Sequence, residues 1–511
     1  MVLLVSVSLF PNEARKKCVG FKRLPEPFIS KHSSHSRAFL LFLISLALSC
    51  LSGCTPITRQ AILVPMPTPA CIQDIALLPQ NAAAYLNPST SGKELIPYHL
   101  SKLLFEKFKE NHFAPWHRKE PLYSKDVVSR GRQHLEYKNI YGENTLPRDK
   151  EWLYALDRMT AMESYPNTHR WAIAITNSNL RVLPTTRPAF YDFGSAGEGY
   201  PFDHLQISAV WGGTPLFISH TSADGSWLIA ETPFASGWIP VSDIAYVDEP
   251  FIKEYETNRL AALIKDEIPI SDHASRFRFM GKVGSVFPIV AAKEGAFEIL
   301  IPAADWNRNA ILLRGNLSRE RATEMPLAAT PENIASLINE LLRKPYGWGG
   351  LYENRDCSST MKDLFTPFGI WLPRSSPRQA REGFFIPLQG LELREKEKTI
   401  IRNAVPFLTL LWMPGHIGLY IGEDRGRALI FHSTWGIKTK DSVGREGRKI
   451  IGETVITTLQ PGIELPDILL PGGNLLYRIA GMTLLTPEGS AQDLNAKREK
   501  QKWMNTQSPG N

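Results

Sequence analysis

One cysteine and two histidines in the C-terminal third constrain this chain more than any other feature. Cys357 follows Asp356, a good helix N-cap, and precedes apolar residues at helical spacing, so its thiol is expected in the first turn of a helix. His416 and His432 lie on two runs of alternating residues, typical of the paired strands of one hairpin. A thiol nucleophile needs a nearby imidazole, and that imidazole needs an orienting partner. The three residues therefore predict Cys-His-His chemistry.

The predicted positions give each of these groups a role. Backbone N–H groups and the dipole at a helix start stabilise a thiolate, so we expect the pKa of Cys357 to lie below the usual ~8.5. The same donors can hold the oxyanion of a tetrahedral intermediate. If Gly422 pairs with Ala428, His416 and His432 share one face of the hairpin, about one diagonal apart. His416 is then the general base and His432 the residue that orients it.

Other interpretations of the same residues stay open at this point. Cys357 can be a small buried hydrophobe, or it can form a disulfide with Cys71, which an oxidising compartment would permit. Each histidine can be a satisfied surface residue. A zinc ion held by Cys357, His416 and His432 is a further alternative, but their wide spacing and the lack of a second cysteine or carboxylate pattern argue against a metal. We expect no cofactor.

The first 53 residues have the pattern of a targeting segment. Basic Lys31 and Arg37 precede an apolar run at 38–48, which is too short for a membrane-spanning helix and suits a signal peptide. Leu51-Ser-Gly-Cys54 follows directly and resembles the lipobox of bacterial lipoproteins. The resemblance implies that 1–53 is removed, that Cys54 is lipidated, and that the membrane is a partner through this anchor.

Two further points bear on location and partners. Thr55 follows the lipobox cysteine where an Asp would favour the inner membrane, so resemblance to lipoprotein sorting favours the periplasmic face of the outer membrane. The first 53 residues hold seven Lys and Arg against two acids, so about +2 of the +7 net charge remains without them. No nucleic-acid partner is therefore expected.

Changes in residue pattern divide the rest of the chain. Residues 100–110 and 152–159 carry apolar side chains at helical spacing, whereas short strand-like runs separated by turn residues fill 171–247 and 276–317. Gly-Trp-Ile-Pro-Val at 237–241 resembles the end of bacterial SH3-like domains. The predicted segments are a Pro-rich tether at 54–80, a helical domain at 81–168, SH3-like β-barrels at 169–250 and 251–328, a C-terminal domain at 329–480 and a polar tail at 481–511.

The motifs of the C-terminal domain, taken in order, resemble the NlpC/p60 family of cell-wall cysteine peptidases. They are Tyr346-Gly-Trp-Gly-Gly with Asp356-Cys357-Ser358, Pro373-Arg-Ser-Ser with Gln379, Pro414-Gly-His416-Ile-Gly-Leu-Tyr-Ile-Gly, and Phe431-His432-Ser. The resemblance implies a papain-like α+β fold in which Cys357 is the nucleophile, His416 the base and His432 the third member of the triad. One departure is the turn at 423–427, which is longer than is typical between the two histidine strands.

The order of the domains resembles the subgroup that cleaves the γ-D-glutamyl bond to diaminopimelate or lysine in peptidoglycan stem peptides. In that subgroup the first SH3-like unit helps to wall the site, and residues matching Tyr346, Asp356 and Ser358 hold the free amine of an N-terminal L-Ala. A desolvated ammonium needs such acceptors. Helix capping alone is the simpler role for Asp356, and the two roles are compatible.

Two rival functions are left open by the sequence. The chain can be a tethering lipoprotein whose SH3-like units bind peptidoglycan and whose C-terminal domain is inactive; an occluded Cys357 would favour that function. It can also be a papain-like acyltransferase or amidase acting on lipids, which an apolar groove would favour. Diaminopimelate and lysine are equally compatible with the sequence at the third stem position.

Overall fold

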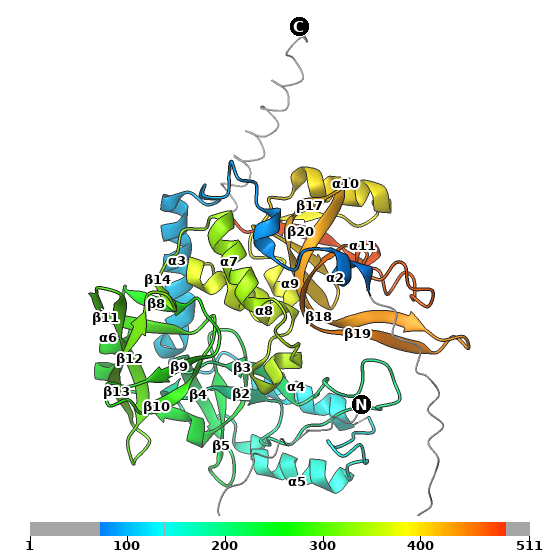
Figure 1. The fold of residues 1–511 in the computed structure, drawn as a ribbon. Helices are drawn as coiled ribbons and strands as arrows, with labels where there is room; N and C mark the ends of the chain where they lie inside the picture. The colour runs from blue at the N-terminus through cyan, green and yellow to red at the C-terminus, as the bar shows by residue number, and fades with distance from the viewer. Residues whose placement is uncertain (1–71, 137, 487–511) are drawn as a thin grey trace, which may run out of the picture. The chain divides into compact units, whose positions relative to one another are not determined.

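The structure, a computed structural model, describes residues 72–136 and 138–486 (Figure 1). Its N-terminal region is helical, as predicted. The apolar period at 100–110 belongs to the long helix α3, whose Phe105 and Phe108 are buried in a cluster that includes Ile173 and Leu260 from the two β-domains. The helices of this region are α2 (Gln73–Leu77), α3 (Tyr98–Phe113), α4 (Lys125–Glu136) and α5 (Lys150–Thr160).

Residues 72–80 correct the predicted tether at 54–80. They form α2 and pack against β19 (Glu446–Thr458), the edge strand of the C-terminal sheet, instead of running as an extended linker. The Asp74 carboxylate accepts the Thr458 N–H at 2.8 Å, and the Gln80 amide bonds the Ile456 backbone at 2.8 and 2.9 Å. These side chains satisfy backbone groups of an exposed edge, a long-range role that local composition does not reveal.

The first β-domain is a seven-stranded antiparallel sheet with the order β3-β2-β6-β5-β4-β1-β7. Short strands with buried Ala, Ile and Leu residues enclose a small core of their own. The strands are β1 (Arg170–Ala174), β2 (Ser178–Arg181), β3 (Gln206–Val210), β4 (Pro215–Thr221), β5 (Trp227–Glu231), β6 (Ser236–Pro240) and β7 (Ile244–Tyr246). This is the first of the two SH3-like units expected from the sequence.

The second β-domain follows helix α6 (Glu249–Tyr255) and has a five-stranded sheet, β13-β12-β11-β8-β14, beside the pair β10-β9. Its strands are β8 (Leu260–Leu263), β9 (Ile268–Ser271), β10 (Phe277–Gly281), β11 (Val286–Lys293), β12 (Ala296–Ala304), β13 (Ala310–Ser318) and β14 (Ala322–Glu324). β8, β9 and β14 lie outside the strand-like block recognised at 276–317. β8 is fully buried, and so lacks the alternation that marks half-exposed strands.

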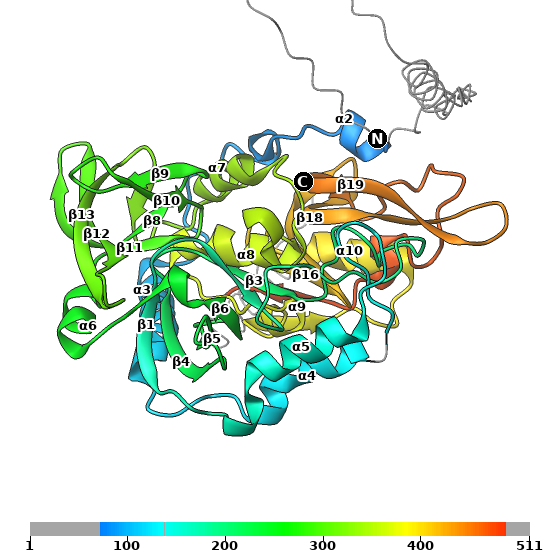
Figure 2. The ribbon, with the colours of Figure 1, turned by 90° about the horizontal axis from the view of Figure 1, so that it is seen from below.

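The C-terminal domain is a six-stranded antiparallel sheet, β15-β20-β16-β17-β18-β19, with helices against it. In both ribbon views α8 lies between the second β-domain and strand β18 (Figures 1 and 2). The elements are α7 (Pro331–Leu341), α8 (Cys357–Phe365), α9 (Ser376–Gln379), β15 (Phe384–Pro387), α10 (Leu393–Asn403), β16 (Thr409–Met413), β17 (His416–Asp424), β18 (Arg427–Lys440), β19, α11 (Leu475–Arg478) and β20 (Gly481–Leu484).

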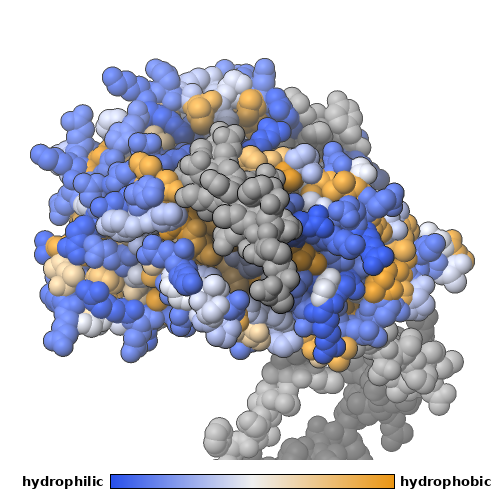
Figure 3. Space-filling model, turned by 90° about the horizontal axis from the view of Figure 1, so that it is seen from above, coloured by the Kyte–Doolittle hydropathy of each residue, from blue (hydrophilic) through white to orange (hydrophobic). Residues whose placement is uncertain are grey.

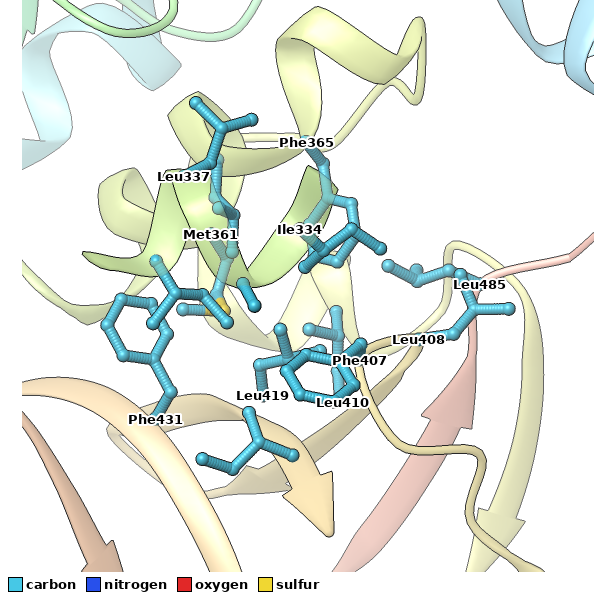
Figure 4. Close-up of a cluster of buried hydrophobic side chains, with 14 of the residues drawn as sticks. Ile334, Leu337, Met361, Phe365, Phe407, Leu408, Leu410, Leu419, Phe431 and Leu485 are labelled. Atoms are coloured by element: carbon cyan, nitrogen blue, oxygen red, sulfur yellow. The ribbon is translucent and has the colours of Figure 1, made fainter. Parts of the chain in front are cut away.

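The core of this domain holds helix α8 in place over the sheet. Figure 4 shows Met361 and Phe365 of α8 among side chains of the strands, with Leu410, Leu419 and Phe431 on the sheet side. All five are fully buried. Each such side chain contributes ~1.5–3 kcal/mol through removal from water. The position of the first residue of α8 is therefore fixed by the packing of its last two turns.

Strand β20 corrects the predicted polar tail at 481–511. It pairs with both β15 and β16, and Met482 and Thr483 are buried in the sheet. A four-residue strand that begins with Gly481 and includes a buried threonine has little hydrophobic pattern of its own, so only its pairing partners identify it. Residues 487–511 lie outside the described part of the chain.

In the hairpin that carries the two histidines, one predicted residue pair is wrong, but the strand register near the histidines is the predicted one. Gly422 pairs with Leu429 and not with Ala428, because a β-bulge shifts the register next to it. Beyond the bulge Leu419 pairs with Phe431, which is the frame the prediction required. The turn is a tight one at Arg425-Gly426, where both residues have positive φ, so most of the segment expected as a long loop is strand.

The surface seen from above is mostly hydrophilic, with apolar side chains in small groups (Figure 3). Among the described residues, no helix has the length and apolar character needed to cross a bilayer. The predicted signal peptide, the lipobox with Cys54, and Cys71 lie outside the described residues.

Candidate active site

Cys357 is the first residue of α8, as the sequence predicts. The Asp356 carboxylate accepts the Ser359 N–H at 2.9 Å, and the Ser359 hydroxyl accepts the Asp356 N–H at 2.9 Å, which completes a capping box. The thiol is free and partly exposed. The satisfied cap thus fixes the position of Cys357 in the first turn of the helix.

The sulfur lies against the strand that carries His416. The backbone N–H of Ile417, the next residue, hydrogen-bonds to it. Burial, followed by the negative charge of Asp356, raises the pKa of Cys357 to about 12, although the Ile417 N–H and the Arg374 guanidinium act in the opposite direction. The expected lowering of this pKa is therefore wrong for the substrate-free site. Desolvation outweighs the helix start, and the resting group is a thiol.

The two histidines form a directed hydrogen-bond chain. Nε2 of His416 and Nδ1 of His432 are 2.8 Å apart, and Nε2 of His432 is 3.1 Å from the Thr457 hydroxyl oxygen. The Thr457 hydroxyl donates its own proton to the Thr458 carbonyl at 2.8 Å, so it accepts from His432. This direction assigns N–H to Nε2 of both histidines and leaves Nδ1 of His416 with its lone pair.

Both imidazoles are neutral at rest. Burial lowers the pKa of His432 to about 3, and burial, then the neighbouring His432 and Arg478, lower the pKa of His416 well below its usual range. Nε2 of His416 and Nδ1 of His432 hydrogen-bond to each other, so these two nitrogens do not face a shared metal position. The arrangement suits a base with an orienting partner better than the alternative zinc site.

Arg374 is a site residue that the sequence reasoning missed. Its guanidinium holds the Asp356 carboxylate with two bonds of 3.0 and 2.5 Å and donates to the Ser358 hydroxyl at 2.8 Å. Although burial opposes ionisation, Arg374 keeps the pKa of Asp356 below its ordinary value. The signal was present in the Pro373-Arg-Ser-Ser run, but nothing in the chain nearby shows that this arginine folds back onto α8. Gln379 fixes that fold-back by donating to the Ser358 and Pro373 carbonyls.

The three residues predicted to hold a substrate amine come together, but their acceptors are largely occupied. Oδ1 of Asp356 already accepts hydrogen bonds from the Ser359 N–H, from Arg374 and from the Ser358 hydroxyl at 3.2 Å, and Oδ2 accepts from Arg374 and from the Gly349 N–H. Tyr346 is near enough that the charges of Asp356 and Cys357 add to burial in raising the pKa of its phenol. Its hydroxyl makes no hydrogen bond to any described residue.

Comparison with known proteins agrees with this geometry. Residues 343–443 match the NlpC/P60 family, 41–165 the N-terminal stabilising domain of such proteins, 188–240 an SH3 domain of the SH3b1 type and 248–294 one of the SH3b2 type. The chain therefore contains an NlpC/P60 domain, preceded by the N-terminal stabilising domain and two SH3 domains. NlpC/P60 proteins are a family of cysteine peptidases.

One solved structure extends the likeness over most of the chain. An NlpC/P60 endopeptidase from Photobacterium damselae subsp. piscicida is 29% identical with a TM-score of 0.72, over 80% of this chain and 98% of that one. An NlpC/P60 family protein from Bacillus cereus is 13% identical with a TM-score of 0.41, over 62% of this chain and 100% of that one. No curated protein matches the chain.

The first SH3 domain contacts the site of the NlpC/P60 domain directly. Gly349 and Gly350, in the turn η5 (Trp348–Glu353) before the nucleophile, have positive φ and approach β3 so closely that a Cβ on Gly350 would lie 2.5 Å from the Ala209 nitrogen. Gln206 donates to the Gly349 carbonyl at 3.0 Å, and Ser208 accepts from Nε of Arg374 at 2.9 Å. The SH3 domain thus helps to hold the arginine that pairs with Asp356.

Aromatic side chains from both domains surround this contact. Phe202, in the loop before β3, packs edge-on against Trp348 and against Trp435 of β18. The ring centroids are 5.2 Å and 6.1 Å apart, respectively. Tyr200 and Tyr346 contact the same Trp435. These rings make one wall shared by the first SH3 domain and the NlpC/P60 domain.

Proposed function

We propose that this protein is a cysteine endopeptidase that hydrolyses the γ-D-glutamyl bond to the diamino acid of peptidoglycan stem peptides. The observation that carries the proposal is the Cys357 thiol beside the Ile417 N–H, on the strand that begins with a neutral His416, which His432 orients at 2.8 Å. These are the nucleophile, base and orienting group that acyl transfer requires. The NlpC/P60 domain and the likeness to a solved NlpC/P60 endopeptidase support the hydrolase class.

Acylation follows from the direction of the hydrogen-bond chain. Nδ1 of His416 takes the Cys357 proton as the sulfur attacks the γ-carbonyl carbon of D-Glu, and the imidazolium is stabilised through His432 and Thr457. Backbone N–H groups at the start of α8 hold the oxyanion. The tetrahedral intermediate collapses as His416 returns its proton to the leaving amine, which breaks the C–N bond and leaves a thioester.

Deacylation uses the same groups in reverse. Water loses a proton to Nδ1 of His416 and attacks the thioester carbon. The C–S bond breaks, the γ-carboxylate of the glutamyl product is released, and Cys357 regains its proton from His416. Because the resting pair is neutral, the proton moves when the substrate is in place, and no preformed thiolate is required.

The proposed substrate has a free N-terminal L-Ala, whose amine is held by Tyr346, Asp356 and Ser358. The unpartnered phenol of Tyr346 and the wall shared with the first SH3 domain support a short, closed acyl side. Since Arg374 already donates to both carboxylate oxygens of Asp356, the Tyr346 hydroxyl is the acceptor best placed for an ammonium. Released stem peptides are then the substrates, and N-acetylated or glycan-linked stems are cut more slowly.

The proposed location is the periplasmic face of the outer membrane, through a lipid on Cys54. It is supported by the apolar run at 38–48 and the lipobox-like Leu51-Ser-Gly-Cys54, followed by Thr55. Metabolic labelling with a palmitate analogue, compared with a Cys54→Ala variant, tests the anchor separately from the enzymatic activity.

Neither rival function is favoured by the site. A tethering protein with an inactive domain would be expected to have a blocked thiol, whereas Cys357 is free and partly exposed. A lipid acyltransferase or amidase would be expected to line its nucleophile with apolar groups, whereas Asp356, Ser358 and Arg374 lie beside this one.

Mass spectrometry of L-Ala-γ-D-Glu-diaminopimelate incubated with the purified full-length protein tests the proposal. We expect release of L-Ala-D-Glu by the wild type, and a loss of at least about 10³-fold in the Cys357→Ala variant, because binding alone supplies little catalysis. An N-acetylated peptide serves as the control for amine recognition. Equal cleavage by wild type and variant would refute the nucleophile, and retained wall binding without cleavage would favour the tethering function.

A further inference from the structure

Arg478 is a half-buried cation beside the catalytic strand that has no carboxylate partner. It ends α11, and its guanidinium donates to the Pro414 carbonyl at 2.8 Å. The same nitrogen lies 4.0 Å from the position of a Cβ on Gly415, the residue directly before His416. Within residues 72–136 and 138–486, Arg478 forms no ion pair. A carbonyl alone leaves most of its donors unused.

Three more deeply buried arginines near the site are each paired with a carboxylate, whereas the half-buried Arg478 is not. Arg374 holds Asp356, Arg355 holds Asp266 at 2.8 Å, and Arg181 holds Asp203 at 2.6 Å. A partly desolvated guanidinium is costly without an anion. The missing anion beside Arg478 is therefore expected from a bound ligand.

A second guanidinium adds to the positive charge at this place. Arg448 of β19, itself bonded to Glu446 at 2.6 Å, is close enough to Arg478 to add to burial in lowering the pKa of Arg478. The Cys357 thiolate form, in contrast, raises that pKa, and Arg478 in turn lowers the pKa of His416. Arg478 thus lies within electrostatic reach of both reacting groups, in a locally positive field.

The position of Arg478 indicates which part of the substrate it meets. His416 gives its proton to the leaving amine, so the leaving residue lies on the side of that imidazole. Arg478 is bonded to the segment that leads into His416, whereas Asp356, Arg374 and Tyr346 gather around the start of α8. The vacant guanidinium therefore belongs to the leaving side of the site.

We propose that Arg478 binds a carboxylate of the leaving diamino acid and makes the enzyme prefer diaminopimelate over lysine at the third stem position. Diaminopimelate carries a second carboxylate at the far end of its side chain, where lysine has only an ammonium. A guanidinium forms paired hydrogen bonds with a carboxylate and repels an ammonium. The inference rests on the proposed function, because it assigns a specificity determinant to that reaction.

The first test compares kcat/KM for L-Ala-γ-D-Glu-diaminopimelate and L-Ala-γ-D-Glu-L-Lys, with wild type, Arg478→Gln and Arg478→Lys. Loss of a charge-assisted pair corresponds to roughly 10- to 100-fold, so we expect the wild-type preference for the diaminopimelate peptide to fall by that factor in Arg478→Gln. Arg478→Lys should recover part of it. Arg425→Gln is the matched control, since the Arg425 side chain is 92% exposed at the hairpin turn.

The second test measures binding without turnover, in Cys357→Ala and in the Cys357→Ala, Arg478→Gln double variant, by calorimetry with the same two peptides. Selective weakening of the diaminopimelate peptide supports the subsite even if the wild type cleaves neither peptide, in which case only the proposed function fails. Equal affinity for both peptides in both variants, or no binding at all, overturns the subsite.

A third peptide identifies which carboxylate is bound. In L-Ala-γ-D-isoglutaminyl-diaminopimelate the α-carboxylate of the glutamyl residue is an amide, and the diaminopimelate is unchanged. We expect the effect of Arg478→Gln to persist with this peptide. If the effect disappears with the amidated peptide and is equal for diaminopimelate and lysine, Arg478 binds the glutamyl carboxylate and the assignment to the leaving residue is wrong.

Discussion

Replacement of Arg355 by Met should uncouple the NlpC/P60 domain from the second SH3 domain. Arg355 lies two residues before the nucleophile, and its side chain is 5% exposed. Its two terminal nitrogens donate to Asp266 of the second SH3 domain at 2.8 Å each, and Nε donates to Asp363 of α8 at 2.6 Å. One guanidinium therefore joins the two domains to the helix that begins with Cys357.

The expected loss of stability in Arg355→Met follows from the partners that the Asp363 and Asp266 carboxylates would keep. Asp363 would retain Lys362 at 2.6 Å and the Trp211 indole N–H at 3.1 Å, so it stays satisfied. Asp266 would retain the backbone N–H of Val283 and the more distant charge of Lys282, but no ion pair with any described residue. Removing one partner of a buried ion pair costs about 3–5 kcal/mol, and we expect Arg355→Met to lie in that range.

Urea unfolding of the full-length protein, followed by tryptophan fluorescence, measures this cost. Arg343→Met is the control, because Arg343 forms a 2.6 Å ion pair with Glu453 but is 51% exposed, and such pairs contribute below about 1 kcal/mol. The double variant Arg355→Met, Asp266→Asn should be more stable than Arg355→Met alone. Equal losses in the Arg355 and Arg343 variants would refute the reasoning.

The loss of stability in Arg355→Met should depend on pH. In the wild type burial opposes ionisation of Asp266, but Arg355 outweighs it and lowers the pKa, so the pair stabilises the fold above the ordinary aspartate pKa. Without Arg355, burial raises the pKa of Asp266, and protonation relieves the penalty. The difference between wild type and Arg355→Met should therefore be largest near pH 7 and shrink toward pH 4.

Two further outcomes are expected. Folded His432 stays neutral down to about pH 3, whereas the unfolded residue protonates near pH 6.5. The free energy of unfolding should therefore decrease as the pH is lowered through this window, by up to ~1.4 kcal/mol per pH unit, and His432→Gln should reduce that slope in urea unfolding. Gly350→Ala should detach the first SH3 domain and expose η5 to proteolysis, whereas Gly390→Ala, at a similar positive φ but in open space, should leave the cleavage pattern unchanged.

The features that the sequence predicted correctly are those with local causes. Asp356 begins a helix because its side-chain oxygen reaches a backbone N–H three residues on, within one turn of chain. The paired histidines follow from the two-residue period of a strand and a hairpin frame that survives a bulge. Such relations need no knowledge of the rest of the fold.

The features that were missed depend on contacts between distant residues. Arg374 reaches back to Asp356, Asp74 covers the edge of β19, and β20 is a strand only because β15 and β16 flank it. The pKa of Cys357 is the clearest case. Local chemistry predicts a lowered value, but the packing of α8 against β17 and β18 removes enough water to reverse the sign.

The same contacts connect domain docking to the reactivity of the nucleophile. Asp356 caps α8, so the helix start requires it, yet its charge disfavours a thiolate on the next residue. Arg374 offsets that charge, and Ser208 of the first SH3 domain helps to hold Arg374 in place. The SH3 domain therefore influences the proton affinity of Cys357 without touching the sulfur. If the domain moved away, Asp356 would be less well neutralised and the thiol harder to ionise, so we expect the docked arrangement to favour ionisation of Cys357.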